Sequence, residues 1–206
     1  MRQAKRAYLI LALLICLLII IKSTDYLIPD FARGFLLGKK EVFYFYKYFL
    51  YAHMVGAPIA LITGIFQFLI TRNRLHKILG KIYVISILFL AAPGGLGMAF
   101  YAIGGFWSIT NFLILSIFWF FATLFAYLKI KEGRIKSHKI WMTRSFILAN
   151  SAVLLRILSY FNNHYHLVEQ PLGYILIGWL SWLPGLLIFE VFFRKTKTSL
   201  PLSAGG

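Results

Sequence analysis

The sequence predicts an all-α fold, an integral membrane bundle of six transmembrane helices with its N- and C-termini in the cytoplasm. The first observation is composition: 60% of the 206 residues are apolar, 14% are charged, and the mean hydropathy is +0.77. A soluble domain of this length has no room to hide so much apolar surface, whereas a bilayer does. The second is arrangement, because six apolar runs alternate with short clusters of lysine and arginine.

Each apolar run approaches the ~20 residues that a helix needs to cross ~30 Å of hydrocarbon. Within a single membrane domain, residues 1–206, the expected spans are 7–22, 46–70, 80–102, 107–129, 141–161 and 173–193. A four-helix core therefore occupies residues 46–161, and residues 194–206 form a basic tail.

The first run is the shortest, and the basic residues before it, Arg2, Lys5 and Arg6, also resemble the start of a signal peptide. No small-x-small cleavage site follows, and Ile15 stands where a lipoprotein signal has a small residue before Cys16. We therefore expect an uncleaved first helix. The single cysteine also excludes an intramolecular disulfide.

Residues 28–45 are expected to form an external segment at the membrane interface. Pro29-Asp30 can open a helix, residues 31–45 mix apolar and basic positions, and an aromatic cluster follows at Phe43–Tyr48. Aromatic rings of this kind lie at the headgroup level. The pattern favours an amphipathic helix on the outer surface, with a substrate-gathering lid as the alternative.

The distribution of lysine and arginine predicts the orientation. Sixteen of the 22 basic residues fall at the N-terminus, in the turns 71–81 and 129–144, and in the tail, all on one side of the expected topology. Positive residues accumulate on the cytoplasmic side of membranes. Both termini are therefore expected in the cytoplasm, with anionic lipid headgroups as partners of the basic face.

Two spans carry a stripe of polar and small residues at steps of three and four, which places each stripe on one helix face. In the second span these residues are His53, Gly56, Ala60, Gly64 and Gln67. In the fifth they are His138, Met142, Ser145, Ala149, Ala152, Arg156 and Ser159. The small members predict close approach of a neighbouring helix.

Depth separates the polar residues into two layers. The candidates for ligand binding or buried polar contacts are His53, Gln67, Asn111 and Arg156, of which Gln67 belongs to the inner layer. Because a charge that faces lipid is costly, His53 and Arg156 should point into the bundle or a wet cavity. The cytoplasmic-face candidates are Arg72, Arg74, His76, Lys77, His138, Lys139, Trp141, Met142 and Arg144. Glu190 is expected to snorkel or pair near Arg194 and Lys195.

Two motifs resemble an uncharacterised family of bacterial multi-pass membrane proteins, domain of unknown function 2306. The first is Gly64-Ile65-Phe66-Gln67-Phe68 followed by Arg74-x-His76-Lys77-x-x-Gly80-Lys81-x-Tyr83, and the second is His138-Lys139-x-Trp141-Met142-x-Arg144-Ser145. The family often has arginine after each histidine, where this chain has Lys77 and Lys139. The resemblance covers about residues 46–160. It implies a membrane domain, which in a bacterium would lie in the inner membrane, and it implies no activity.

Two functions from different classes fit these residues. The first is a non-enzymatic binding, transport or sensing protein, in which His53 and Arg156 form an external pocket for an anionic or lipid-like ligand. The alternative is a b-type haem protein for electron transfer, with His76 and His138 as axial ligands at one depth. Both histidines lie at the water's edge, where they are also explained as interfacial anchors. Mutual satisfaction of polar groups, to fix helix packing, is a third interpretation.

Familiar catalytic signatures are missing from the sequence. It has no Walker loop, no dinucleotide-binding glycine motif, no Gly-x-Ser-x-Gly element and no His-Glu-x-x-His motif. The six acidic residues are scattered, which disfavours a paired-carboxylate site. The net charge of +16 lies between apolar runs, so nucleic-acid binding is not expected. The sequence therefore does not predict an enzyme, and it leaves the ligand and the oligomeric state open.

Overall fold

A computed structural model describes residues 36–69 and 74–198, with a few isolated positions between 14 and 31. This part of the chain is helical apart from turns, and it contains five helical segments long and apolar enough to cross a membrane. They are Phe43–Gln67, Arg74–Ala99, Phe106–Lys131, Ile135–Tyr165 and Leu172–Phe192. These correspond to the last five expected spans, with ends displaced by up to six residues. The expected span 7–22 lies largely outside the described residues, as do Arg72 and the end of the basic tail.

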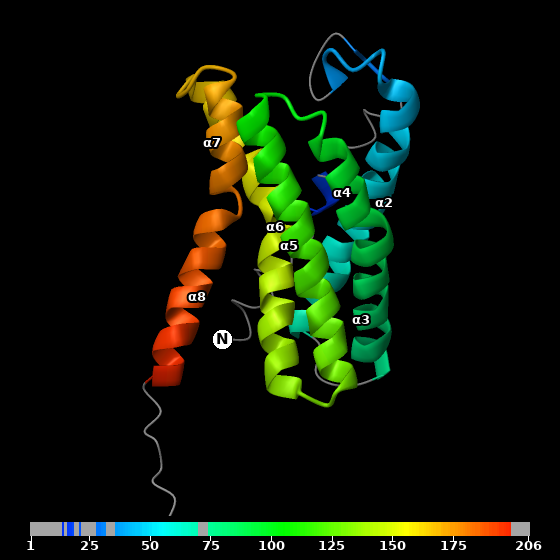
Figure 1. Cartoon of the computed structure of the whole chain (residues 1–206), viewed down its shortest axis with the longest axis vertical. Coiled ribbons are helices and arrows are strands. Elements are labelled where there is room, and N and C mark those ends of the chain that lie inside the picture. The colour runs from blue at the N-terminus through cyan, green and yellow to red at the C-terminus, as the bar shows by residue number, and fades with distance from the viewer. Residues whose placement is uncertain are drawn as a thin grey trace, which may run out of the picture.

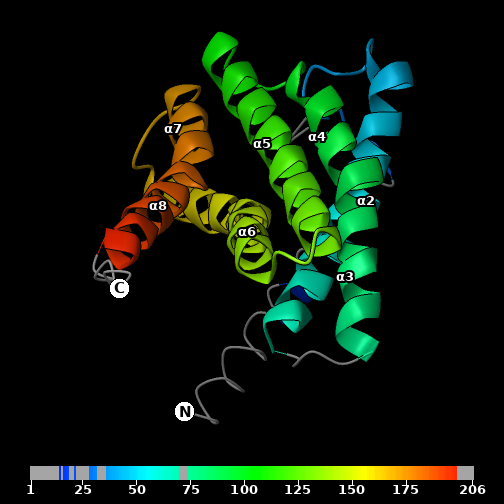
Figure 2. The same ribbon diagram turned by 60° about the horizontal axis from the view of Figure 1, so that its bottom comes forward.

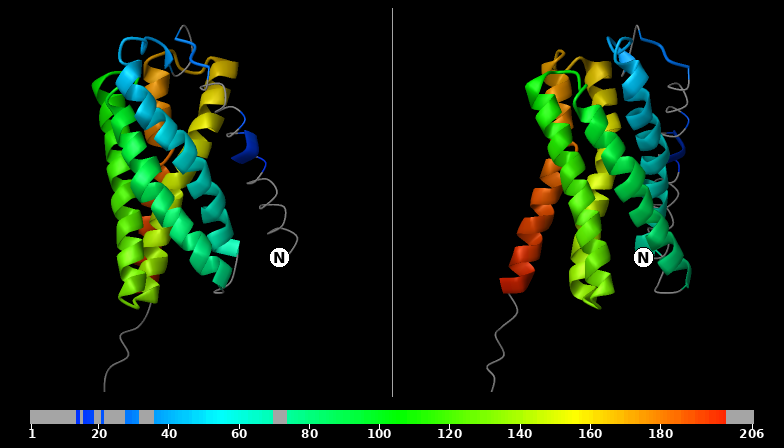
Figure 3. Two further views of the ribbon diagram at one scale, coloured as in Figure 1. Left: turned by 90° about the vertical axis from the view of Figure 1, so that its right-hand side faces the viewer. Right: turned by 45° about the vertical axis from the view of Figure 1, so that its right-hand side comes forward.

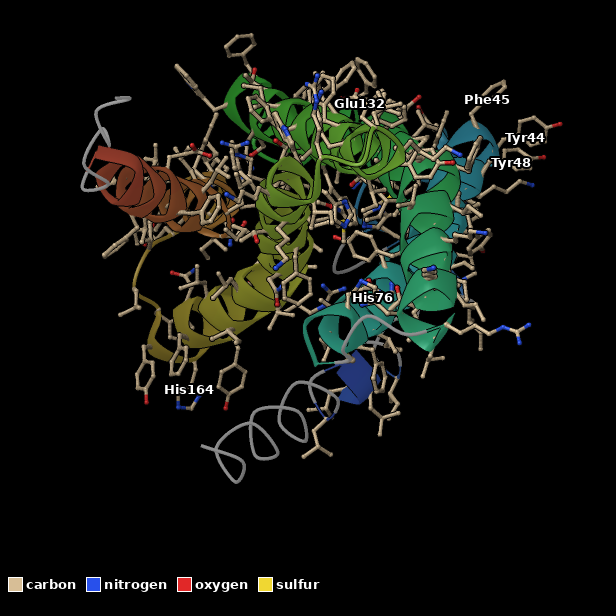
Figure 4. All side chains as sticks on the ribbon, turned by 90° about the horizontal axis from the view of Figure 1, so that it is seen from below. Tyr44, Phe45, Tyr48, His76, Glu132 and His164 are labelled. Carbon is tan, nitrogen blue, oxygen red and sulfur yellow. The ribbon has the colours of Figure 1, made fainter. Side chains whose placement is uncertain are left out.

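The second expected span is helix α2, Phe43–Leu69, which begins three residues earlier than the sequence suggested. The described residues just before it, 36–42, form turns, so the amphipathic helix expected over 31–45 is wrong for this stretch. Tyr44, Phe45 and Tyr48 are each more than 60% exposed and project from the outside of the bundle (Figure 4). This arrangement suits rings that lie in a membrane interface.

The third span is one continuous rod made of three pieces, α3 (Arg74–Ser86), the π-helical turn η3 (Ile87–Ala91) and α4 (Ala92–Ala99). Pro93 explains the change of helix type. In a regular α-helix its ring would collide with the carbonyl group of Phe89, and it has no N–H to donate. The helix widens here, and the N–H of Ala92 bonds to the carbonyl oxygen of Ile87, five residues back.

The small residues of α2 allow this rod to pack closely, as the sequence predicted. A Cβ atom at Gly56 would lie 2.6 Å from Leu90 Cβ and 2.7 Å from the backbone nitrogen of Ala91. Ala60 is fully buried, and a Cβ at Gly64 would lie 2.9 Å from the Tyr83 ring of α3 and 2.8 Å from the Phe146 ring of α6. The backbones therefore meet where side chains are absent.

Helices α5 (Phe106–Lys131) and α6 (Ile135–Tyr165) form a second antiparallel pair (Figure 3). Three buried hydroxyl groups tie this pair to α3. The Ser145 hydroxyl lies 2.8 Å from the Tyr83 hydroxyl and 2.7 Å from that of Thr123, and Thr123 donates to the carbonyl oxygen of Trp119 at 2.8 Å. Away from water, each hydroxyl thus has a partner.

The last span is broken into α7 (Leu172–Leu180) and α8 (Leu183–Thr198). Pro184 accounts for the break, because its ring would collide with the carbonyl group of Leu180 in a continuous helix. At the break, Trp182 Nε1 donates to Asn111 Oδ1 at 2.8 Å, and the Ser181 hydroxyl donates to the carbonyl oxygen of Gly178. The two short helices pack beside α6, on the side away from α3 (Figure 2).

The bundle has two distinct ends. The end of α2, the start of α3 and the α5–α6 connection lie together at one end, and α8 runs toward it (Figure 1). This is the basic end, which contains the two basic turns of the sequence. The start of α2, the α4–α5 turn and α7 lie at the opposite end (Figure 1). The described helices therefore place the two basic turns on one side, as the sequence predicted.

Candidate functional site

A cavity of about 300 Å³ lies among α2, α4, α5, α6 and α7, toward the end opposite the basic turns. Most of its wall is apolar. Its polar and ionisable lining residues are His53, Ser116, Ser151, Arg156 and Tyr174. This volume is at the lower end of the range of small-molecule sites, and an apolar wall with a few polar groups is typical of them.

His53 enters the cavity wall from α2. Its Nδ1 atom lies 2.7 Å from the carbonyl oxygen of Ala91, the last residue of the π-helical turn. The ring also stands edge-on to Trp119, with 6.4 Å between the centroids. Close approach of α4 makes this geometry possible, because a Cβ atom at Gly94 would lie 2.7 Å from the backbone nitrogen of His53. The imidazole is therefore fixed by contacts from three neighbouring segments.

Arg156 borders the same cavity from α6, so the structure brings His53 and Arg156 to one cavity. Its Nη1 atom donates to the carbonyl oxygen of Ala152 at 2.9 Å. The Arg156 side chain is exposed, although it also lines the cavity. The expectation that it points into the bundle or a wet cavity is therefore met only in part. None of the described residues that line the cavity is an aspartate or a glutamate. The wall is thus a cationic and apolar surface.

Asn111 and Gln67 do not belong to this cavity. Asn111 is fully buried and its Oδ1 atom accepts the Trp182 indole N–H, so it holds the broken last span against α5. Gln67 lies at the basic end, where its Nε2 atom donates to the carbonyl oxygen of His76 at 2.8 Å. A Cβ at Gly80 would lie 3.3 Å from Gln67 Oε1. Both amides therefore serve helix contacts.

The second family-like motif connects three helices. His138 Nδ1 lies 2.8 Å from the carbonyl oxygen of Ala126 on α5. Arg144 stacks over the Trp141 ring, 4.3 Å from its centroid, and reaches α8. There its Nε and Nη2 atoms donate to both carboxylate oxygens of Glu190, at 2.6 and 3.0 Å. Met142 is buried in the core. Glu190 therefore pairs near the inner end of the last span, as expected, and this partner comes from another helix.

The remaining cations of the basic end face outward. Arg74, Lys77 and Lys139 are exposed. At the α5–α6 connection, a hydrogen bond from Lys129 to Glu132 holds the pKa of that exposed carboxyl below its ordinary value. These side chains present a positive surface.

The haem hypothesis rests on residues outside the cavity. His76 belongs to α3 and His138 to α6, and neither lines the cavity that contains His53. Nδ1 of His138 lies at hydrogen-bond distance from the Ala126 carbonyl oxygen. The haem assignment stays a prediction.

Sequence reasoning missed the hydroxyl cluster of Tyr83, Thr123 and Ser145 and the pairing of Arg144 with Glu190. Both join residues from different spans. Period-3.6 stripes identify which face of one helix is polar, but they do not say which neighbouring face it meets. The sequence did contain a signal for the ion pair, because Arg144 and Glu190 lie at similar depth near the inner ends of their spans.

Comparison with known families agrees with the earlier resemblance. A family model described as predicted membrane protein (DUF2306) matches residues 50–193. The match includes every residue that lines the cavity, together with both basic motifs from Arg74 onward. No curated protein and no solved structure matches the chain. Because the family model covers more than half of the sequence, the chain belongs to the DUF2306 family of predicted membrane proteins.

Proposed function

We propose that this protein is a non-enzymatic binding protein whose cavity holds an amphiphile with one anionic headgroup. The supporting observation is the chemistry of the wall: it is largely apolar, and it contains Arg156 and His53. The Arg156 guanidinium at the cavity border suits an anionic group of a ligand. The apolar surface favours a hydrocarbon body, at roughly 25 cal/mol for each Å² removed from water.

Arginine suits this role for a geometric reason. A guanidinium group presents N–H donors in a planar fork that matches the two oxygens of a carboxylate or phosphate. Arg156 stands at the exposed border of the cavity, so the headgroup would remain near the membrane surface while the chain enters between the helices. This placement avoids burying a charged headgroup in hydrocarbon.

The orientation belongs to the same proposal. The basic end would face the cytoplasm, where Arg74, Lys77 and Lys139 meet anionic headgroups, and the cavity would open toward the outer half of the membrane. In a cell membrane, the ligand would then be taken from the outer leaflet or from the external solution.

Trp119 provides the means to test the proposal, because it lines the cavity. The protein would be reconstituted in lipid nanodiscs and titrated with dodecanoate brominated at its chain end, since bromine quenches indole fluorescence on contact. Saturable quenching is expected, and it should disappear in Trp119→Phe. Quenching that only rises linearly, as for a probe dissolved in the lipid, would contradict the proposal.

Two arginines give a matched comparison. Arg156→Gln removes the cation beside the cavity and should weaken binding of the brominated acid about tenfold or more, because a charge-assisted contact contributes ~1.5–3 kcal/mol. Arg134→Gln removes an exposed cation from the α5–α6 connection and should leave binding unchanged. The neutral brominated dodecanol should bind weakly to both variants and to the parent protein. Equal effects of the two arginine substitutions would refute the role of Arg156.

A further inference from the structure

Two serine hydroxyl groups in the cavity wall are buried without a hydrogen bond to the protein. They belong to Ser116 on α5 and Ser151 on α6, and both residues line the cavity. Each is more than nine-tenths buried, with 7% and 6% of its surface exposed. Neither hydroxyl bonds to any part of the chain that the structure describes. Because a hydroxyl withdrawn from water is costly unless it finds a partner, both groups favour a polar atom supplied by a ligand.

The other hydroxyl groups of these helices show the usual arrangement. In each of three threonines the hydroxyl donates to the carbonyl oxygen four residues back, at 2.6 to 2.9 Å; they are Thr63, Thr123 and Thr143. A hydroxyl that bonds to its own helix in this way has used its single hydrogen. Ser116 and Ser151 have not, and their oxygens are not closed off from the space of the cavity.

The two serines lie at one level of the bundle. The contact of 2.7 Å between the hydroxyls of Thr123 and Ser145 fixes the register of the antiparallel helices α5 and α6. Moving about two helical turns toward the cavity leads from Thr123 to Ser116 on α5 and from Ser145 to Ala152 on α6. Ser151 directly precedes Ala152. Two hydroxyl donors from neighbouring helices therefore reach the cavity at the same depth.

This level lies deeper in the bundle than the cavity border where Arg156 stands. Arg156 follows Ala152 by about one turn of α6, ~5.4 Å, toward the end of the helix. An anionic headgroup near Arg156 and an oxygen atom near the serines would therefore be several bonds apart in one ligand. The cavity thus suits a second polar group below the headgroup, followed by hydrocarbon.

A carbonyl oxygen matches the two serines better than other groups. It carries no charge, so it can lie among apolar side chains, and its two lone pairs can accept from two hydroxyl groups at once. A plain hydrocarbon chain would leave both donors unmatched, which is costly on binding in the same way as in folding.

We infer that the ligand of this cavity is an acylated anionic amphiphile, whose acyl carbonyl oxygen, between headgroup and tail, accepts hydrogen bonds from Ser116 and Ser151. This inference rests on the proposed function and specifies its ligand. A monoacylglycerol phosphate has the required order of groups: a phosphate, then an ester carbonyl, then a single hydrocarbon tail.

The test is competition against the brominated dodecanoate in nanodiscs. The competitors are 1-dodecanoylglycerol 3-phosphate and its 1-O-dodecyl ether, which have the same headgroup, charge and chain length and differ only in the carbonyl oxygen. The ester should displace the probe at roughly one tenth of the concentration that the ether requires, as expected for matched hydrogen bonds. Equal potency of ester and ether would overturn the inference.

Serine substitutions assign the effect to the two hydroxyls. In the double variant Ser116→Ala with Ser151→Ala, the advantage of the ester over the ether should fall to about onefold, because both donors are gone. Ser108→Ala is the matched control: Ser108 is also a buried serine of α5 without a hydrogen bond, but its oxygen is closed off and it does not line the cavity. It should keep the tenfold advantage. An advantage that survives in the double variant, or that disappears in Ser108→Ala, would contradict the assignment.

The outcomes separate this inference from the proposed function. If the probe binds saturably and Arg156→Gln weakens it, but ester and ether compete equally or not at all, the carbonyl inference falls and the proposed function stands. If the probe shows no saturable quenching, both fall. The comparison of ester with ether in the parent protein decides the matter whether or not the variants fold.

Discussion

Gly56→Ala should loosen the contact between α2 and the π-helical turn, although alanine is the better helix former. The added Cβ would lie 2.6 Å from Leu90 Cβ, 2.7 Å from the Ala91 nitrogen and 2.9 Å from the Ser86 carbonyl oxygen. Ordinary contacts between non-bonded carbon atoms are about 3.5–4.0 Å, so the overlap approaches ~1 Å. Two of the three atoms are backbone, and no change of rotamer can move them.

The two helices must therefore separate, and the size of that separation sets the loss of stability. A gap of 0.5–1 Å forfeits roughly a quarter to a half of the dispersion energy of each atom pair across the interface. Overpacking of this kind costs typically ~1–3 kcal/mol, and the helix propensity of alanine returns up to ~1 kcal/mol. A net loss of about 1–2 kcal/mol in the free energy of unfolding is expected.

Gly185→Ala is the matched control. It places the same methyl group in α8, where the nearest atom, Ile147 Cγ2, is at an ordinary 3.4 Å. Stability should be unchanged or slightly higher. Both variants would be unfolded in mixed micelles of increasing sodium dodecyl sulfate content and followed by circular dichroism. Because Gly56 contacts Ala91, the partner of His53, Gly56→Ala should also weaken binding in the cavity. Equal stability of the two variants would refute the reasoning.

Two further predictions concern charged groups. Arg144→Met and Glu190→Gln should each lower the free energy of unfolding by about 2 kcal/mol, between the values for exposed and buried pairs, because the two side chains are 19% and 32% exposed. A double-mutant cycle should show a combined loss well below the sum, whereas strict additivity would argue against the pair. Burial lowers the pKa of Lys39 to about 8 from 10.5, so between these pH values the unfolded chain binds more protons. Over this pH interval, the free energy of unfolding of the parent protein should rise relative to that of Lys39→Met. Parallel pH profiles of the two proteins would contradict this.

Patterns within one helix were readable from the sequence, because the helical period fixes them. The stripe from His53 to Gln67 faces the neighbouring rod as expected, and Gly56 and Gly64 permit close approach. The depth argument also placed His53 and Arg156 at one cavity. Lipid requires that each span bury its own backbone hydrogen bonds, so the spans themselves are strongly determined.

Relations between helices were harder to predict. Asn111 has the depth of the outer site, yet its rotation about the α5 axis turns it toward Trp182 and away from the cavity. The break before Pro184 was missed because hydropathy continues across it, even though proline removes a backbone donor there. Glu190 is paired across helices because the broken last span brings α8 beside α6, which no local pattern records.

The π-helical turn at Ile87–Ala91 also acts as a rotational offset along the third span. An α-helix turns by about 100° for each residue, so a widened turn that absorbs one extra residue shifts every later side chain around the axis. On a regular helical wheel, the residues of α3 and of α4 that face α2 would therefore not fall on one side. Removing one residue from 87–91 would restore a uniform wheel but rotate Gly94 and Gly97 away from α2. In an alignment of the family, a single-residue gap at this point would mark the members that lack the histidine's backbone partner.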